Sequence, residues 1–61
     1  MHKIQEGDKI RVIIKAPHTN FTSEMTGIVT EIEDHGFWMT EDQQKEEFVT
    51  FDEIAELTFI E

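Results

Sequence analysis

The sequence predicts an all-β fold: a small five-stranded, strongly bent antiparallel barrel with one short helical turn before the last strand. Short runs of β-branched and aromatic residues alternate with polar residues, which is typical of strands. Turns rich in glycine and acidic residues separate these runs. The chain has 61 residues, including five Phe and one Trp, which suits a single compact domain over residues 1–61 with an aromatic core.

The first strand is expected over residues 9–16, after a turn at residues 7–8. Its β-branched residues alternate with Arg11 and Lys15, so it has one apolar and one largely basic face. Pro17 ends the strand, because proline has no N–H to donate to a β-ladder.

A loop is expected over residues 17–25, which are rich in side-chain oxygens that bond the backbone in turns. Phe21 and Met25 are the only large apolar residues of this stretch. They either pin the loop onto the core, which is the favoured interpretation, or form part of a binding surface.

Residues 26–40 are expected to form a hairpin with strands over 26–33 and 37–40. Gly27, inside the first of these strands, indicates a bulge or a sharp bend. Gly36 belongs to the tight turn between the strands and suits a positive φ there.

The polar segment 41–47 is too charged for a core and is expected to form the exposed connection of a second hairpin. A fourth strand follows over residues 48–51. Alternation leaves open which of its faces is buried: Phe48 with Thr50, or Val49 with Phe51.

The end of the chain is expected to form one helical turn over residues 52–55, with Asp52 as its N-cap, and a fifth strand over residues 56–60. A single helix over residues 52–61 is the competing interpretation. The β-branched and aromatic residues at 58–60 favour the strand.

The net charge of −9 is unevenly distributed. Residues 1–20 hold four basic and two acidic residues, whereas residues 21–61 hold one lysine and twelve acids. A chain this acidic repels phosphate backbones, so no direct nucleic-acid binding is expected and a basic protein surface is the favoured partner. The alternative is that the charge only confers solubility.

Catalysis, cofactors, metals and membranes are not expected. No cysteine is present, and His2, His18 and His35 lack the spacing of convergent metal ligands. Neighbouring acids on a polar tip are all solvated, whereas hydrolytic pairs need one desolvated carboxylate. No apolar run approaches the roughly 20 residues that span a bilayer. The first residues also lack the order of a signal peptide, so a cytoplasmic protein is expected.

The order of apolar positions and turns in residues 27–34, 37–39 and 48–57 resembles that of known small barrels. It is similar to SH3-like barrels of the Sm-like type and to the YolD-like proteins of Gram-positive bacteria and their phages. The resemblance implies a barrel and, more weakly, a homo-oligomeric ring or dimer formed through the last strands. The RNA-chaperone branch carries Tyr-Lys-His where this chain has Thr50, Phe51 and Asp52, so its RNA activity is not implied.

The leading functional hypothesis is a module whose acidic surface meets a basic patch on a partner protein. In its stronger form, the carboxylates imitate DNA phosphates and inhibit a nucleic-acid-binding protein, which suits a phage-sized reading frame. Trp38 points away from Phe37 and Met39, so it is either an exposed anchor or a buried core residue. The predicted partner-binding residues are Glu31, Glu33, Asp34, Trp38, Glu41, Asp42, Glu46 and Glu47.

A second hypothesis is an Sm-like ring that binds a nucleotide or signal molecule at its subunit junctions, and a third is a purely structural subunit. Arg11 and Lys15 share a strand face and are the predicted anion-binding residues. Alternatively, they pair with acids across the sheet, with Glu31 or Glu33 as candidates.

Overall fold

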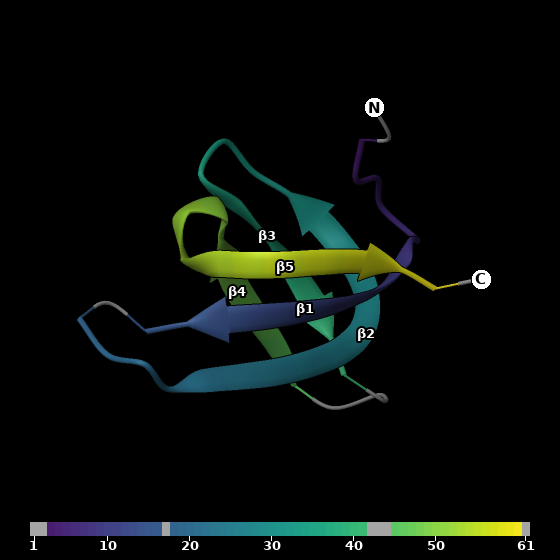
Figure 1. Cartoon of the computed structure of the whole chain (residues 1–61). Coiled ribbons are helices and arrows are strands. Elements are labelled where there is room, and N and C mark those ends of the chain that lie inside the picture. Colours follow the sequence, from purple (N-terminus) through teal and green to yellow (C-terminus); the bar gives the residue numbers. More distant parts are fainter. Residues whose placement is uncertain (1–2, 17, 42–44, 61) are drawn as a thin grey trace.

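The computed structural model describes residues 3–16, 18–41 and 45–60, which form one antiparallel sheet in the order β4-β3-β2-β1-β5 (Figure 1). Its elements are β1 (Lys9–Lys15), β2 (Thr22–Ile32), β3 (Gly36–Thr40), β4 (Glu46–Thr50), the 3-10 turn η1 (Phe51–Glu53) and β5 (Ile54–Phe59). The prediction of five antiparallel strands in an all-β fold is confirmed. The sheet is not closed, because β4 and β5 are its two edges.

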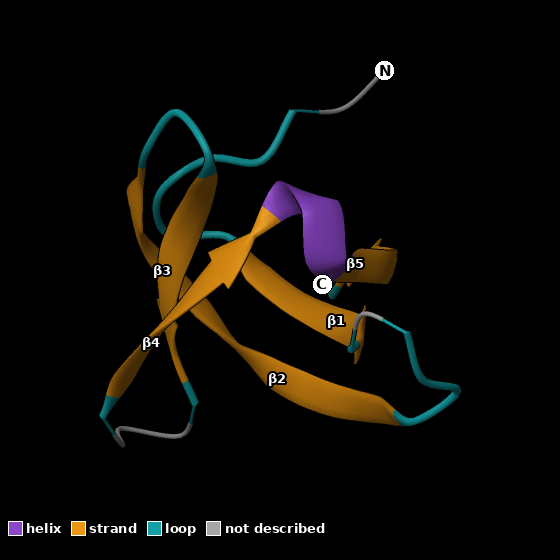
Figure 2. Ribbon diagram, turned by 90° about the vertical axis from the view of Figure 1, so that its left-hand side faces the viewer, coloured by secondary structure: helices purple, strands orange, loops and turns teal. Residues whose placement is uncertain are grey.

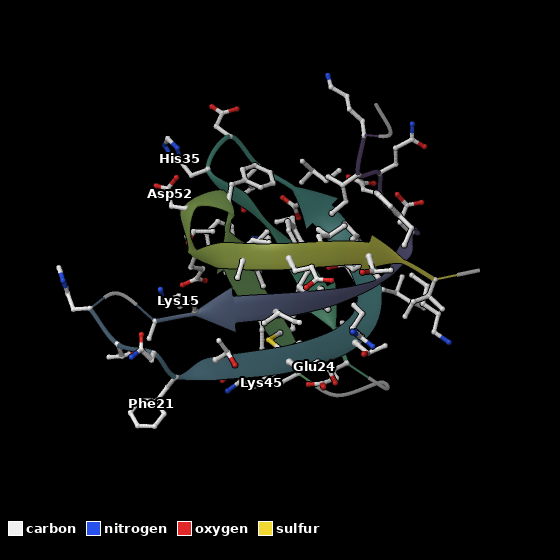
Figure 3. The ribbon with its side chains drawn as sticks, viewed as in Figure 1. Lys15, Phe21, Glu24, His35, Lys45 and Asp52 are labelled. Atoms are coloured by element: carbon white, nitrogen blue, oxygen red, sulfur yellow. The ribbon has the colours of Figure 1, made fainter. Side chains whose placement is uncertain are left out.

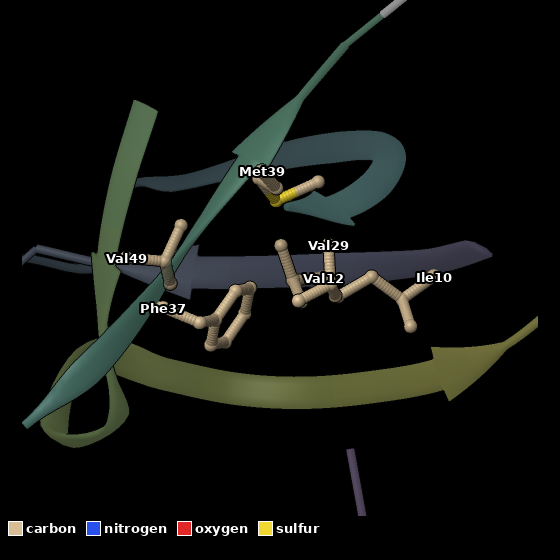
Figure 4. Packing of buried hydrophobic residues seen from close by; sticks show 6 residues of the cluster. All are labelled: Ile10, Val12, Val29, Phe37, Met39 and Val49. Atoms are coloured by element: carbon tan, nitrogen blue, oxygen red, sulfur yellow. The ribbon is translucent and has the colours of Figure 1, made fainter. Parts of the chain in front are cut away.

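Six side chains are fully buried and line the inner face of the sheet (Figure 4): Ile10, Val12, Val29, Phe37, Met39 and Val49. They come from four strands at alternating positions, as the period of two predicted. Partly buried residues from the flanking elements pack around them, among them Ile14, Met25, Leu57 and Phe59. The core therefore lies on the inner side of the bent sheet, and the backbone of the strands separates it from solvent on the outer side.

Four strands begin earlier than the sequence predicted: β2 by four residues, β4 and β5 by two, and β3 by one. β2 begins at Thr22 because residues 22–25 pair with the second half of β1, so the expected loop shrinks to the short connection before Thr22. β4 begins at Glu46, which pairs with Thr40. An edge strand accepts such charged residues because their side chains reach solvent.

The connection between β1 and β2 corrects the expectation for its apolar residues. Phe21 does not pin the loop, because 82% of its surface is exposed. Met25 instead lies inside β2, where it packs partly buried against the core.

Gly27 allows two backbones to approach closely where β2 curves. A Cβ added there would lie 2.0 Å from the carbonyl oxygen of Thr40. Of the two predictions for this glycine, a bulge or a sharp bend, the bulge lies further along β2, where the pairing with β3 shifts between Val29 and Glu31. The first half of β2 pairs with β1 and its second half with β3, so one curved strand joins both sides of the bent sheet.

Gly36 also serves close approach and not a positive φ, which corrects the sequence-based expectation. An added Cβ would lie 2.1 Å from the carbonyl oxygen of Val49 on β4. The reason is its place at the start of β3, where it pairs directly with Thr50.

The helical turn before the last strand is confirmed, but it begins one residue earlier than expected. η1 starts at Phe51, and the backbone N–H of Thr50 donates to the Glu53 carboxylate at 3.2 Å. Asp52 therefore lies inside the turn and is not its N-cap. Phe51 N–H donates to the carbonyl of His35 at 2.9 Å, which ties η1 to the β2–β3 turn (Figure 2). The competing single helix is contradicted, since residues 54–59 form β5.

Candidate functional site

Two aromatic rings lie side by side on the outer face of β3 and β4. Phe37 and Met39 are fully buried, so Trp38 between them points to the solvent side, where it is half-buried. Phe48 is its direct partner on β4, with ring centroids 5.1 Å apart and planes inclined by 55°. Phe48 is 36% exposed. Of the alternatives left open by the sequence, Val49 faces the core and Phe48 faces out, whereas Phe51, expected on the same face as Val49, lies in η1 and is 42% exposed.

Three carboxylates flank this aromatic pair. The Trp38 indole N–H donates to the carboxylate of Glu33, the residue that follows β2. Glu46 on β4 accepts a hydrogen bond from the Thr30 hydroxyl at 3.2 Å. The shift in pairing between Val29 and Glu31 sets Glu31, and not Thr30, directly opposite Trp38. A backbone irregularity therefore places an acid beside the indole.

Ile28 extends the apolar part of this surface on β2. It is 46% exposed and pairs with Thr40, two residues along β3 from Trp38 on the same face. We call this surface the acidic aromatic face. Its residues are Ile28, Glu31, Glu33, Trp38, Glu46 and Phe48.

The chemistry of the acidic aromatic face suits a cationic side chain. An ionised carboxylate has about four acceptor positions. The bond from Trp38 occupies one position on Glu33, and the bond from Thr30 occupies one on Glu46, so both carboxylates keep acceptor positions for a ligand. An ammonium or guanidinium group within about 6 Å of an aromatic ring centroid is also attracted by the ring quadrupole. The apolar stem of a lysine or arginine would find apolar surface on Ile28 and Phe48.

The other acids predicted for partner binding lie elsewhere. Asp34 is exposed in the β2–β3 turn. Glu47 pairs with the buried Met39, so its side chain leaves β4 on the other face, and Glu41 is half-buried just after β3. Asp42 lies outside the described residues. The structure thus gathers Glu31, Glu33, Trp38 and Glu46 out of the predicted set.

Sequence reasoning missed Ile28 and Thr30 and did not commit to Phe48. The usable signal for Phe48 was the alternation in β4, once Val49 is known to face the core. No local signal marks Thr30, because its role depends on the shift in pairing with β3.

The predicted anion-binding residues do not converge. The Arg11 Nε lies 3.1 Å from the Glu24 carboxylate, so the partner is neither Glu31 nor Glu33. The reason is the antiparallel register, in which Arg11 faces Thr26 and has Glu24 as a diagonal neighbour. Lys15 lies four residues further along β1, about 13 Å away along a strand, and is exposed.

Three further features are absent from the described part of the chain. Within residues 3–16, 18–41 and 45–60, no group of three or more His, Cys, Asp or Glu is placed to hold a metal ion. None of these described residues is a buried polar or charged one. Within the same ranges, no helix has the length and apolar character needed to traverse a bilayer.

No family model matches the chain, and neither a curated protein nor a solved structure matches it. The resemblance to Sm-like and YolD-like barrels therefore stays a prediction.

Proposed function

We propose that the protein is a small binding module whose acidic aromatic face binds a basic segment of a partner protein. The observation that carries the proposal is the Trp38–Phe48 ring pair on the solvent side, with Glu33 and Glu46 beside it. A solvent-facing aromatic pair flanked by acids can hold both the stem and the head of a basic side chain.

The physical terms point to a modest affinity. A cation on an exposed aromatic ring contributes about 0.5–1 kcal/mol, and an exposed ion pair contributes about 0.2–1 kcal/mol. Two ring contacts and three ion pairs of this size sum to about 2–5 kcal/mol, and the upper part of this range corresponds to a dissociation constant of about 0.2–1 mM for a peptide-sized ligand. The charge of −9 adds steering over longer distances, which raises the association rate.

Two finer proposals accompany this function. The strand order, with β5 on β1 and η1 joining the two edges, supports an SH3-like or Sm-like barrel that is open between β4 and β5. In the more specific functional form, the basic partner is a cytoplasmic nucleic-acid-binding protein, for which the carboxylates replace phosphates.

Peptide titration tests the proposal, and the single tryptophan makes it direct. Trp38 lies on the face itself, so its fluorescence reports a ligand there. Arginine- and lysine-rich peptides should bind, and a neutral peptide of the same length should not. The double variant Glu33→Gln with Glu46→Gln should weaken binding about tenfold, equivalent to about 1.4 kcal/mol.

Glu56→Gln is the matched control, because Glu56 is an exposed acid on β5 that pairs with Ile13 on a different part of the sheet. It should change the affinity by less than about twofold, the effect of a distant screened charge. The double variant Glu56→Gln with Asp52→Gln removes two acids outside the face. If it weakens binding as much as the Glu33 and Glu46 double variant, the net charge of the protein drives binding and the position of the acids does not matter. Absence of binding at about 1 mM peptide would refute the proposal.

A further inference from the structure

The tip of the β1–β2 hairpin carries the most exposed large hydrophobic side chain described. Phe21 is 82% exposed, against 46% or less for the other large exposed hydrophobics. Figure 3 shows it pointing away from the rest of the molecule, near the end of the hairpin that also carries Lys15. We call Lys15 together with residues 18–21 the hairpin tip.

The hairpin tip is organised by its own hydrogen bonds. Thr19 accepts from the backbone N–H of Phe21 and donates to the carbonyl of Ala16, both at 3.3 Å. The Ala16 N–H donates to the Phe21 carbonyl at 3.4 Å, and His18 has a left-handed φ of 61°. Phe21 is therefore presented by an ordered backbone, which lowers the entropic cost of binding through it.

The hairpin tip is complementary in charge to the acidic aromatic face. Residues 9–23 contain three basic side chains and no acid, in a chain whose net charge is −9. Of these three, Arg11 is paired with Glu24, whereas Lys15 is exposed at the end of β1, on the opposite face of the hairpin from Phe21. The tip thus offers an aromatic ring and an ammonium group, which are the two groups that the face suits.

The two surfaces of one molecule cannot meet each other. Figure 2 shows the β1–β2 connection on the side of the molecule away from β3 and β4, which carry the ring pair. A contact between them must therefore join two molecules.

We propose that the hairpin tip of one molecule docks on the acidic aromatic face of a second copy. This inference rests on the proposed function, that the face binds cations, and names a second copy as the occupant. Phe21 packs on Trp38 and Phe48, and the Lys15 ammonium pairs with the flanking carboxylates. Because the contact joins two different surfaces, it is heterologous and generates open head-to-tail chains.

Ionic strength decides whether this contact can form, because two copies repel each other through their net charge of −9. At 0.15 M salt the screening length is about 8 Å, so charges beyond that distance are largely screened. The smallest extent of the molecule is 22 Å, so most charges of a neighbouring copy lie further away than the screening length. The charged groups that meet in the contact itself lie within the screening length. Association is therefore expected at moderate salt, with a dissociation constant of about 0.1–1 mM.

Mixing two disabled variants tests this model. The tip variant carries Phe21→Ser and Lys15→Glu, and the face variant carries Glu31→Lys and Glu46→Lys. All four positions are exposed, so both variants should fold, which dichroism checks. In sedimentation velocity at 0.15 M salt, the wild type should grow beyond its 7.2 kDa monomer as its concentration rises, and each variant alone should not.

An equimolar mixture of the two variants should form a heterodimer and stop there, because it retains one intact tip and one intact face. A mixture that stays monomeric, or a wild type that is monomeric throughout, overturns the inference. Variants that associate as strongly as the wild type overturn it too, because another surface then joins the copies. If the wild type stays monomeric but still binds cationic peptides, the proposed function stands and only the self-docking model falls.

A vesicle-binding experiment tests the main competing partner of the hairpin tip, which is a lipid surface. Binding of the wild type to vesicles with about 30% anionic lipid, lost on Phe21→Ser, would assign the tip to a lipid surface and overturn self-docking. The net charge of −9 opposes such binding, so no flotation with these vesicles is expected.

Discussion

Replacing Gly27 by alanine should unfold a large share of the protein. The added Cβ would lie 2.0 Å from the Thr40 carbonyl oxygen and 2.8 Å from its carbon. Both atoms are backbone, so no side-chain rotation relieves the clash and β3 must move away from β2 by about 1 Å. This motion strains the ladder at the Ile28–Thr40 pair.

The cost of Gly27→Ala follows from two terms. Overpacking costs about 1–3 kcal/mol, and two weakened ladder hydrogen bonds cost about 0.5–1.5 kcal/mol each, so the loss is about 2–6 kcal/mol. A domain of this length has a total stability of about 3–9 kcal/mol. The substitution should therefore remove most of the stability, and in the upper part of the range it should abolish folding.

Urea denaturation followed by far-ultraviolet dichroism measures this loss. Thr26→Ala, at the neighbouring half-buried position of β2, is the control and should cost less than about 1 kcal/mol. A Gly27→Ala variant within about 1 kcal/mol of the wild type would refute the argument, because it would mean that the two backbones separate freely.

Three further predictions concern the hairpin and the charges. A double-mutant cycle between Arg11→Ala and Glu24→Ala should give a coupling of no more than about 0.5 kcal/mol, because the side chains are 47% and 57% exposed; a value above about 1.5 kcal/mol would contradict this view. His18→Val should lower the free energy of unfolding, measured by urea denaturation, by about 1–2 kcal/mol, because a β-branched residue disfavours a φ of 61°; His18→Gly should not lower it. Raising the salt from about 0.05 M to about 0.5 M should weaken capture of cationic peptides several-fold in the fluorescence titration, and an unchanged affinity would argue against the role of the carboxylates.

Local patterning predicted the strands well where each face has one character. The alternation in β1 follows from the sequence alone, and so does the placement of Phe37 and Met39 on one face of β3 with Trp38 on the other. Patterning failed where both faces carry apolar groups, as in Phe48 and Val49, because burial there depends on which residues of β3 lie opposite. Register between distant segments is a tertiary property that local propensity does not contain.

The candidate site shows the same division. The acidity of the surface and the importance of Trp38 were visible from composition and strand parity. The selection of Glu31, Glu33 and Glu46 from the many acids was not visible, since it follows from a shift in pairing and from hydrogen bonds across the sheet. The Arg11 partner was missed for a related reason, because the β2 strand begins four residues before the expected position and brings Glu24 beside β1.

The last strand is one of the two edges of the sheet, and none of its residues is fully buried. β5 pairs with β1 alone, and its residues that face the core, Ile54, Leu57 and Phe59, are only partly buried. An element with this little buried surface can detach while the remaining strands stay paired, at a free energy below that of global unfolding. Amide protons of β5 should then exchange with deuterium through such local openings, ahead of those shared by β2 and β3. Each opening would briefly uncover the apolar side of β1 to water.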